Sequence, residues 1–161
     1  MKTARGALRE ELTATLLPEL RRLGFEGPSR IDGRALVYEF SRRDGDIRHV
    51  LTLQLEKRGL PRFVLGLALE PPEGFAALTA RGGTTMTGQL RPRRDASVRG
   101  WFRADPTLWQ RLRGDRASRH VEAVAACVAL LPEVESWWRD PKSSAHIVAY
   151  PVRFPGTAAP A

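Results

Sequence analysis

Residues 36–69 read LVYEFSRRDGDIRHVLTLQLEKRGLPRFVLGLAL, and the alternation in this stretch decides the fold class. Large apolar side chains alternate with polar or smaller ones in three runs: 36–40, 50–56 and 63–69. Alternation with a period of two is typical of strands that bury one face of a sheet. Asp44-Gly45 is a strong hairpin signal between the first two runs, and a second turn is expected at 58–61. The stretch therefore predicts an antiparallel meander of three strands.

A stripe of leucines precedes the meander: Leu8, Leu12, Leu16, Leu20 and Leu23. Their spacings of four and three residues put them on one face of a helix over about residues 3–23, which Gly24 would end. Pro18 lies inside this stripe. Because proline removes a helical hydrogen bond, either the helix kinks at Pro18 or a last turn restarts with Pro18 in its first position.

The elements after the meander are marked mainly by proline and glycine. Pro71-Pro72 ends the third strand, and we expect a loop from there to Gly83. Two weaker strands, a short helix, a longer helix and a last strand follow, at 84–90, 98–103, 105–114, 118–131 and 146–154. An exposed arginine-rich turn at 91–95 would join the two weaker strands. Pro132 would interrupt the longer helix, and Pro151 would confine the last strand to a sheet edge.

Length and composition indicate one globular domain. The chain has 161 residues, of which 42% are hydrophobic and 27% charged, and neither a repeat nor a change of composition divides it. We predict a single α+β domain over 1–155, with a flexible tail at 156–161. Its antiparallel sheet has about five strands, and the N-terminal helix and the C-terminal helices pack on one face of that sheet.

The sequence gives no indication of secretion or of a membrane span. Charged side chains interrupt each turn of the first 20 residues, and the longest apolar run, 124–131, is shorter than the ~18 residues that cross a bilayer. The single cysteine, Cys127, cannot form an internal disulfide. We therefore expect a cytoplasmic protein without a membrane partner.

Basic charge is the strongest feature of the composition. The chain has a formal net charge of +8, and ten of its arginines lie within residues 81–119 with only three acids. We predict there a surface for an anion or a partner, formed by Arg91, Arg93, Arg94, Arg99, Trp101 and Arg103. Strand alternation would put positions 99, 101 and 103 on one face. The alternatives are a solvated basic turn and an arginine excess that reflects the composition of the genome.

Candidates for catalysis are few. His49, His120 and His146 are far apart, no nucleotide-binding motif occurs, and His120-Val121-Glu122 lacks the PCxxC that zinc deaminases require. His120 and Cys127 would share a helix face but lie about 10.5 Å apart along its axis, too far for a hydrogen bond. We expect Cys127 to be an inert core residue. We therefore predict no catalytic residue, no cofactor and no metal.

Trp137 and Trp138 close the last long helix. Adjacent helical side chains point in different directions, so one ring would face away from the other. Two interpretations remain open. The pair forms either a hydrophobic lid over the sheet or an exposed surface that recognises a partner.

Several stretches resemble a family of small uncharacterised bacterial domains, of the class called domains of unknown function. The matching stretches are the helix end Leu17-Pro18-Glu19-Leu20-Arg21-Arg22-Leu23-Gly24-Phe25, the strands Leu51-Thr52-Leu53-Gln54 and Phe63-Val64-Leu65-Gly66-Leu67, a tryptophan-containing middle and a C-terminal helix. The resemblance covers most of residues 5–140. It implies an α+β fold, and it implies no activity or site residue because the family has no established catalytic motif.

Three classes of function remain open. The first is a non-catalytic interaction domain, such as an accessory or immunity-like protein, that binds a protein or a small ligand through the sheet or the tryptophan-bearing helix. The second is binding of nucleic acid or phosphate through residues 81–119, which requires the arginines to converge on one face. The third is an enzyme, which requires a pocket with at least two titratable groups. We expect a protein partner.

Overall fold

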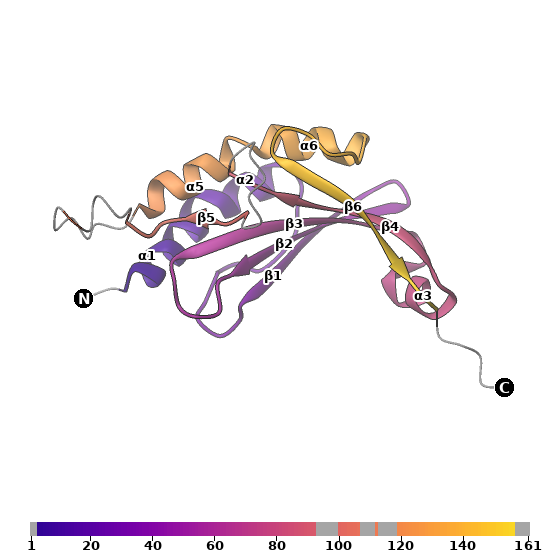
Figure 1. Ribbon diagram of the computed structural model, residues 1–161, viewed down its shortest axis with the longest axis horizontal. Helices are drawn as coiled ribbons and strands as arrows, with labels where there is room; N and C mark the ends of the chain where they lie inside the picture. Colours follow the sequence, from indigo (N-terminus) through magenta and orange to yellow (C-terminus); the bar gives the residue numbers. More distant parts are fainter. Residues whose placement is uncertain (1–2, 93–99, 107–111, 113–118, 157–161) are drawn as a thin grey trace.

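The computed structural model describes residues 3–92, 100–106, 112 and 119–156. Its elements in chain order are α1 (Ala4–Glu11), a π-helical turn η1 (Leu12–Leu16), α2 (Leu17–Arg22), β1 (Val37–Asp44), β2 (Ile47–Leu55), β3 (Arg62–Glu70), α3 (Gly74–Arg81), β4 (Gly83–Leu90), β5 (Phe102–Arg103), α5 (His120–Val128), α6 (Leu131–Arg139) and β6 (Ile147–Phe154). The strands form one antiparallel sheet in the order β1-β2-β3-β4-β6, with the short β5 also paired to β3 (Figure 1). The predicted α+β class is confirmed.

The predicted meander is confirmed strand by strand. Asp44 pairs with Ile47 across the loop Gly45-Asp46, and Gly45 has a φ of 59°, as the first position of a type II′ turn requires. The register then places Leu53 between Tyr38 and Leu65. Directly opposed side chains share a face, so the large apolar residues of all three strands point to one side.

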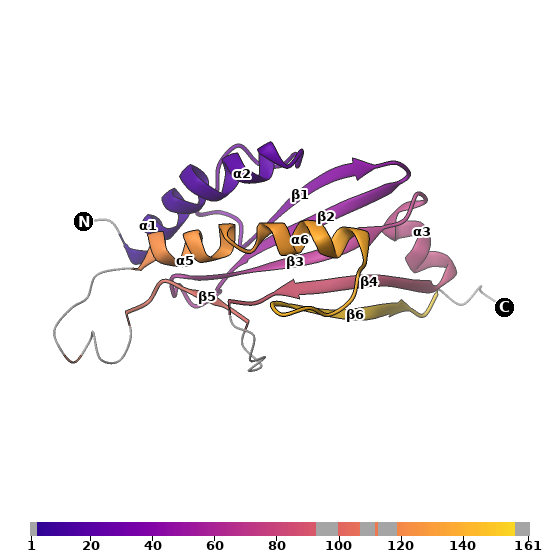
Figure 2. The ribbon, with the colours of Figure 1, turned by 90° about the horizontal axis from the view of Figure 1, so that it is seen from above.

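The helices α1, α2, α5 and α6 cover that apolar side (Figures 1 and 2). The predicted leucine stripe is buried, with Leu8, Leu12, Leu16 and Leu20 at most 1% exposed. Helix α5 packs beside α1 and η1 and contributes buried Val124 to the same core. The expected packing of the N-terminal and C-terminal helices on one face of the sheet is therefore confirmed.

The π-helical turn explains how Pro18 fits into the first helix. The Leu17 N–H donates to the Leu12 carbonyl, one residue further back than in an α-helix. Pro18 then occupies the first turn of α2, where a missing N–H costs no helical hydrogen bond. Of the two predicted alternatives, the restart is the nearer one, but α2 begins at Leu17, so Pro18 is its second residue rather than its first.

The loop predicted between Pro71-Pro72 and Gly83 is wrong, because this stretch contains helix α3. Prolines before it and glycines after it gave a strong loop signal. The intervening Phe75-Ala-Ala-Leu-Thr-Ala is too short to show a full helical period but has good helical propensity. Leu78 is buried and anchors the helix at the end of the sheet far from the N-terminus (Figure 2).

The two weaker strands lie along the same edge of β3. Leu90 of β4 pairs with Leu65, and Phe102 of β5 pairs with Phe63, so β5 continues the line of β4 after residues 91–101. The predicted strand at 98–103 is shorter in the described residues: only Phe102–Arg103 form it, and Trp101 precedes it half-buried. Phe102 stacks on Phe63 with ring centroids 5.0 Å apart.

The C-terminal elements agree with the prediction, including the interruption at Pro132. The longer helix ends at Val128, and Pro132 lies in the first turn of a separate helix, α6. Strand β6 is at the sheet edge, as Pro151 indicated. Most of the helix predicted at 105–114 and of the tail at 156–161 lies outside the described residues. Within the described ranges, no helix is long and apolar enough to cross a membrane.

Candidate functional site

Most of the predicted arginine surface cannot be placed, because Arg93, Arg94 and Arg99 lie outside the described residues. Arg91 is half-buried rather than exposed: its N–H donates to the His146 carbonyl, and its side chain packs against Gly100, where a Cβ would come within 2.8 Å of the Arg91 Cγ. The Nε of Arg91 is buried without a hydrogen-bond partner. The expectation of a fully exposed Arg91 is therefore wrong.

Arg103 is exposed but ion-paired. Its guanidinium and that of Arg62 both bind the carboxylate of Asp105, at 2.7 Å for the shortest contact of each. Burial would raise the pKa of Asp105, but the hydrogen bonds from Arg62 and Arg103 outweigh it and hold that pKa well below its usual range. Asp105 thus neutralises part of the charge that the sequence concentrates here.

Arg81 lies apart from Arg103, and Arg119 has a carboxylate partner of its own. Arg81 pairs with Glu73 on α3, and Arg119 pairs with Glu122 on α5. Helix α3 and strand β5 lie at opposite ends of the sheet (Figure 2). Among the described residues, the arginines of this segment are therefore dispersed and mostly paired with carboxylates.

Both tryptophans predicted as a partner surface are buried, Trp137 at 2% and Trp138 at 6% exposure. Their rings pack edge to face with centroids 4.9 Å apart. Trp137 lies over Gly88 of β4, where a Cβ would come 3.1 Å from the ring, and Trp138 stacks on His49 of β2. The interpretation as a lid over the sheet is correct, and Trp137 and Trp138 do not form an exposed recognition surface.

Cys127 is fully buried, and its burial raises the pKa of its thiol far above the usual range. A thiolate is the reactive form, so this environment makes Cys127 a poor nucleophile. In the part of the chain that the structure describes, no three His, Cys, Asp or Glu side chains are arranged to hold a metal ion.

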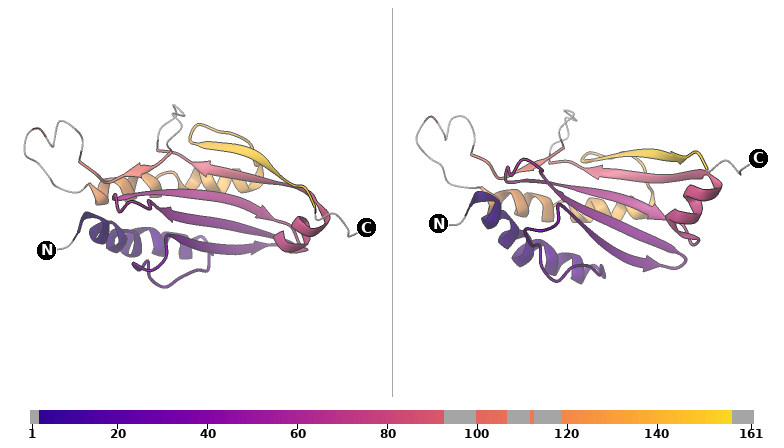
Figure 3. Two further views of the ribbon diagram at one scale, coloured as in Figure 1. Left: turned by 60° about the horizontal axis from the view of Figure 1, so that its bottom comes forward. Right: turned by 90° about the horizontal axis from the view of Figure 1, so that it is seen from below.

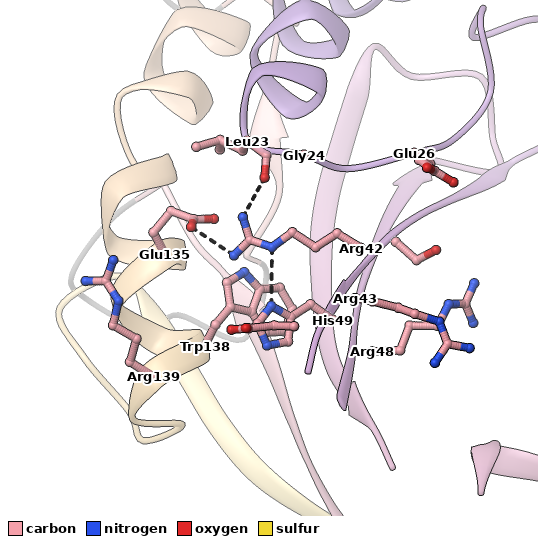
Figure 4. A pocket seen from close by; sticks show the side chains of 12 residues that line it. Leu23, Gly24, Glu26, Arg42, Arg43, Arg48, His49, Glu135, Trp138 and Arg139 are labelled. Carbon is pink, nitrogen blue, oxygen red and sulfur yellow. Dashed lines mark hydrogen bonds and ion pairs between the residues drawn. The ribbon is translucent and has the colours of Figure 1, made fainter. Parts of the chain in front are cut away.

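A polar pocket of about 770 Å³ opens between the end of α2, the β1–β2 hairpin and α6 (Figure 4). Arg42 lies at its centre and donates three hydrogen bonds: to the Leu23 carbonyl at 2.6 Å, to Glu135 at 2.8 Å and to Nδ1 of His49 at 3.3 Å. The guanidinium also lies 4.6 Å from the ring centroid of Phe25. Arg42 thus joins a helix end, a second helix and the neighbouring strand.

His49 is held in its neutral form in this pocket. Burial lowers its pKa, and the positive charge of Arg42 lowers it further. Because Arg42 donates to Nδ1, that nitrogen is an acceptor and the ring proton is on Nε2. The sequence analysis did not single out this pair, although the predicted hairpin register already places Arg42 opposite His49. The contacts of Arg42 tie three elements together, which is a structural role.

The side of the sheet away from α1, α2, α5 and α6 is not covered by these helices (Figure 3). On β2, β3, β4 and β6 the central residues of this side are uncharged. Three of the uncharged residues on this side, Val50, Val64 and Thr85, are at most 9% exposed, Tyr150 is exposed, and the others are half-buried. Cross-strand pairing places twelve uncharged residues here: Val50, Thr52, Gln54, Val64, Gly66, Ala68, Thr85, Thr87, Gln89, Val148, Tyr150 and Val152. We call this set the open face. Solvent-facing strands usually alternate with polar and charged residues, so an uncharged area in a chain with 27% charged residues is unexpected.

Gly66 and Ala68 make the centre of the open face shallow. Gly66 lies opposite Thr52, and a Cβ on Gly66 would come 2.5 Å from the Thr52 hydroxyl. Tyr150, 47% exposed, provides an aromatic ring at the margin on β6. Charged groups border the face, for example Arg48 between Glu39 and Glu70. The even-numbered residues of 50–54 and 64–68 already carry this pattern in the sequence.

Both edges of the sheet are partly blocked. On β6, Ser143 accepts a hydrogen bond from the Ala149 N–H, Ser144 donates to the Ile147 carbonyl, and Pro151 has no N–H. On β1, Glu26 bridges to Ser41. Blocked edges disfavour the addition of a further strand. The open face therefore offers a partner a larger accessible surface than either edge of the sheet.

Comparison with known protein families, with curated proteins and with solved structures finds no match to this chain.

Proposed function

We propose that this protein is a non-catalytic binding domain that holds a protein partner on its open face. One observation carries the proposal: the twelve neighbouring residues on the side of the sheet away from the helices are uncharged, nine of them are at least partly exposed, and charged groups border them. Depletion of charge at the centre with a polar rim is the composition of protein–protein interfaces. The threonine and glutamine side chains of the open face can be hydrated when no partner is bound. They therefore suit an interface whose partner also exists free in solution.

The open face is the size of the centre of an interface. It extends over five residues of each of four strands, β2, β3, β4 and β6, and at about 4.8 Å between strands and about 3.4 Å per residue it spans roughly 19 by 17 Å. A standard interface covers ~800 Å² per partner, so the partner would also contact the charged residues that border the open face. Since both sheet edges are blocked, the partner would contact side chains of the face rather than extend the sheet.

Two other readings receive less support. The Arg42 pocket offers titratable groups, but its central guanidinium is engaged in structural contacts. For nucleic-acid binding through residues 81–119, the described arginines Arg81, Arg103 and Arg119 are each paired with a carboxylate, and Arg91, which lies at the same end of the sheet as Arg103, is half-buried. A duplex-DNA titration at about 0.1 M salt tests that alternative, and our proposal expects no binding up to about 100 μM, the weak end of non-specific affinity. We take the domain to act in the cytoplasm as an accessory protein.

A photo-crosslinking experiment tests the proposal in the cells that make the protein. Benzoylphenylalanine replaces Thr87, at the centre of the open face, or Val121, which is exposed on α5 on the other side of the sheet. We expect irradiation to couple one protein, identified by mass spectrometry, to position 87 and not to position 121. Coupling at position 121 alone, or none at either position, would overturn the proposal.

A further inference from the structure

The two ends of the open face differ in charge. At the end formed by the β2–β3 turn and β5, the charged residues on the face and its bordering turn are Glu56, Lys57, Arg58, Arg62, Arg91, Arg103 and Asp105. At the end formed by the β1–β2 hairpin and α3, they are Glu39, Arg43, Asp46, Arg48, Glu70, Glu73 and Arg81. Among the residues that the structure describes, the first end has five cations and two anions, and the second has three cations and four anions. We call the first end the basic end.

The two carboxylates of the basic end are already engaged. The Asp105 side chain is 3% exposed beneath Arg62 and Arg103, and Glu56 accepts from the Leu60 N–H. The Arg103 side chain is 60% exposed, and Lys57 and Arg58 are exposed in the turn. At the basic end, Arg62 and Arg103 share one carboxylate, that of Asp105, whereas at the other end Arg48 lies between Glu39 and Glu70 and Arg81 pairs with Glu73. The basic end therefore offers positive charge that the rest of the described chain does not neutralise.

We infer that the partner of the open face is an acidic protein, whose carboxylates lie over the basic end while uncharged side chains cover the centre. This inference rests on the proposed function and specifies the partner's chemistry. Charge complementarity of this kind sets orientation and raises the association rate, and it weakens with salt beyond a Debye length of about 8 Å.

Two other occupants fit the open face less well. Single-stranded nucleic acids bind sheets by stacking bases on aromatic rings, and among the twelve side chains of the open face Tyr150, at the margin, is the one aromatic. A second copy of the chain, net charge +8, would bring an excess of positive charge to the interface. In the second copy, the described residues at the end formed by the β1–β2 hairpin and α3 have four anions and three cations. This small excess of negative charge matches the basic end poorly.

The test uses the partner protein that crosslinks to position 87. This partner is purified and titrated against variants of the present chain that carry no crosslinking residue. The double variant Lys57→Glu, Arg58→Glu reverses the basic end, and Arg30→Glu, Arg34→Glu is a matched control with the same change of net charge in an exposed loop near α1. We expect the first double variant to weaken binding at least tenfold at about 0.15 M salt, mainly through a slower association rate. The control should change the dissociation constant less than twofold.

The outcomes distinguish a failure of the acidic-partner inference from a failure of the proposed function. If Ala68→Arg at the centre abolishes binding but reversal of Lys57 and Arg58 weakens it no more than the control does, the open face is the binding site and the acidic-partner inference is wrong. If Ala68→Arg also leaves binding unchanged, the proposed function fails and the inference falls with it. Recovery of nucleic acid or of a second copy at position 87 overturns the inference directly.

Discussion

The guanidinium of Arg42 donates a hydrogen bond of 2.8 Å to the carboxylate of Glu135 and so joins β1 to α6 across 93 positions of the chain. The same guanidinium binds the last carbonyls of the N-terminal helix through Leu23. This one side chain fixes the helical layer to the apolar side of the sheet. The opposite side, which we propose as the binding surface, is left free of helices except at the α3 end (Figure 3).

Replacing Arg42 by methionine should destabilise the fold. The substitution keeps much of the stem but leaves the Leu23 carbonyl, His49 Nδ1 and the Glu135 carboxylate without their donor. The full cost of an orphaned buried charge is about 3–5 kcal/mol. The Arg42 and Glu135 side chains are 17% and 22% exposed, so we expect about 1–3 kcal/mol in a urea melt. Arg22→Met, at an exposed pair with Glu19, is the control, and an equal effect of both variants would refute the role of Arg42.

His49 should make the protein less stable as the pH falls below 6.5, its ordinary pKa. Burial and Arg42 lower the pKa of the folded form, so the unfolded chain binds the proton first. The contribution of neutral His49 is complete above pH 6.5 and is lost as the pH falls towards the folded pKa. Urea melts of wild type and His49→Gln between pH 7.5 and about 5 measure this, with a shallower slope expected for the variant. Parallel slopes would show that His49 does not titrate in this way.

Leu53→Ala should cost about 2–5 kcal/mol of unfolding free energy, because Leu53 is fully buried between Tyr38 and Leu65 under the helices. Val121→Ala, at an exposed position of α5, should change stability by less than about 0.5 kcal/mol. A loss below about 0.5 kcal/mol for Leu53→Ala in the same denaturant melts would show that Leu53 is not part of the core.

Cys127 should react slowly with a thiol reagent in the native protein and rapidly after unfolding, because the thiol is fully buried and its pKa is raised. The measurement is the labelling rate with and without denaturant. Rapid labelling of the native protein would restore Cys127 as a candidate nucleophile.

The sequence predicted the sheet better than the connections between its strands. Alternation and the Asp44-Gly45 turn were enough for the meander, because a two-residue hairpin also fixes the register. Helix α3 was missed since eight residues between prolines and glycines do not show a helical period. The paired positions of β3 and β5 could not be foreseen, because eleven residues separate β5 from β4 and nothing local fixes where the chain returns.

The candidate site was predictable only in part. The alternation of residues 63–69 implies that Val64, Gly66 and Ala68 lie opposite the apolar residues of β3, but their significance depends on β4 and β6, which extend the uncharged area. The sequence could not decide whether Trp137 forms a lid over the sheet, because its ring packs on Gly88. The two residues are 49 positions apart, and no local pattern encodes such a contact. Ion pairing of Arg103 with Asp105 likewise depends on Arg62 from the neighbouring strand.

The most direct test of the central claim is the affinity of the Ala68→Arg variant for the protein crosslinked at position 87. Ala68 lies between Val50 and Thr87 in the middle of the open face, and an arginine there extends into solvent in the free protein without disturbing the core. Ala68→Ser controls for the change of residue without adding bulk or charge. We predict at least a hundredfold weaker binding for Ala68→Arg, with unchanged binding for Ala68→Ser and a native melting profile for both. Binding of Ala68→Arg within twofold of wild type would contradict the assignment of the open face as the binding surface.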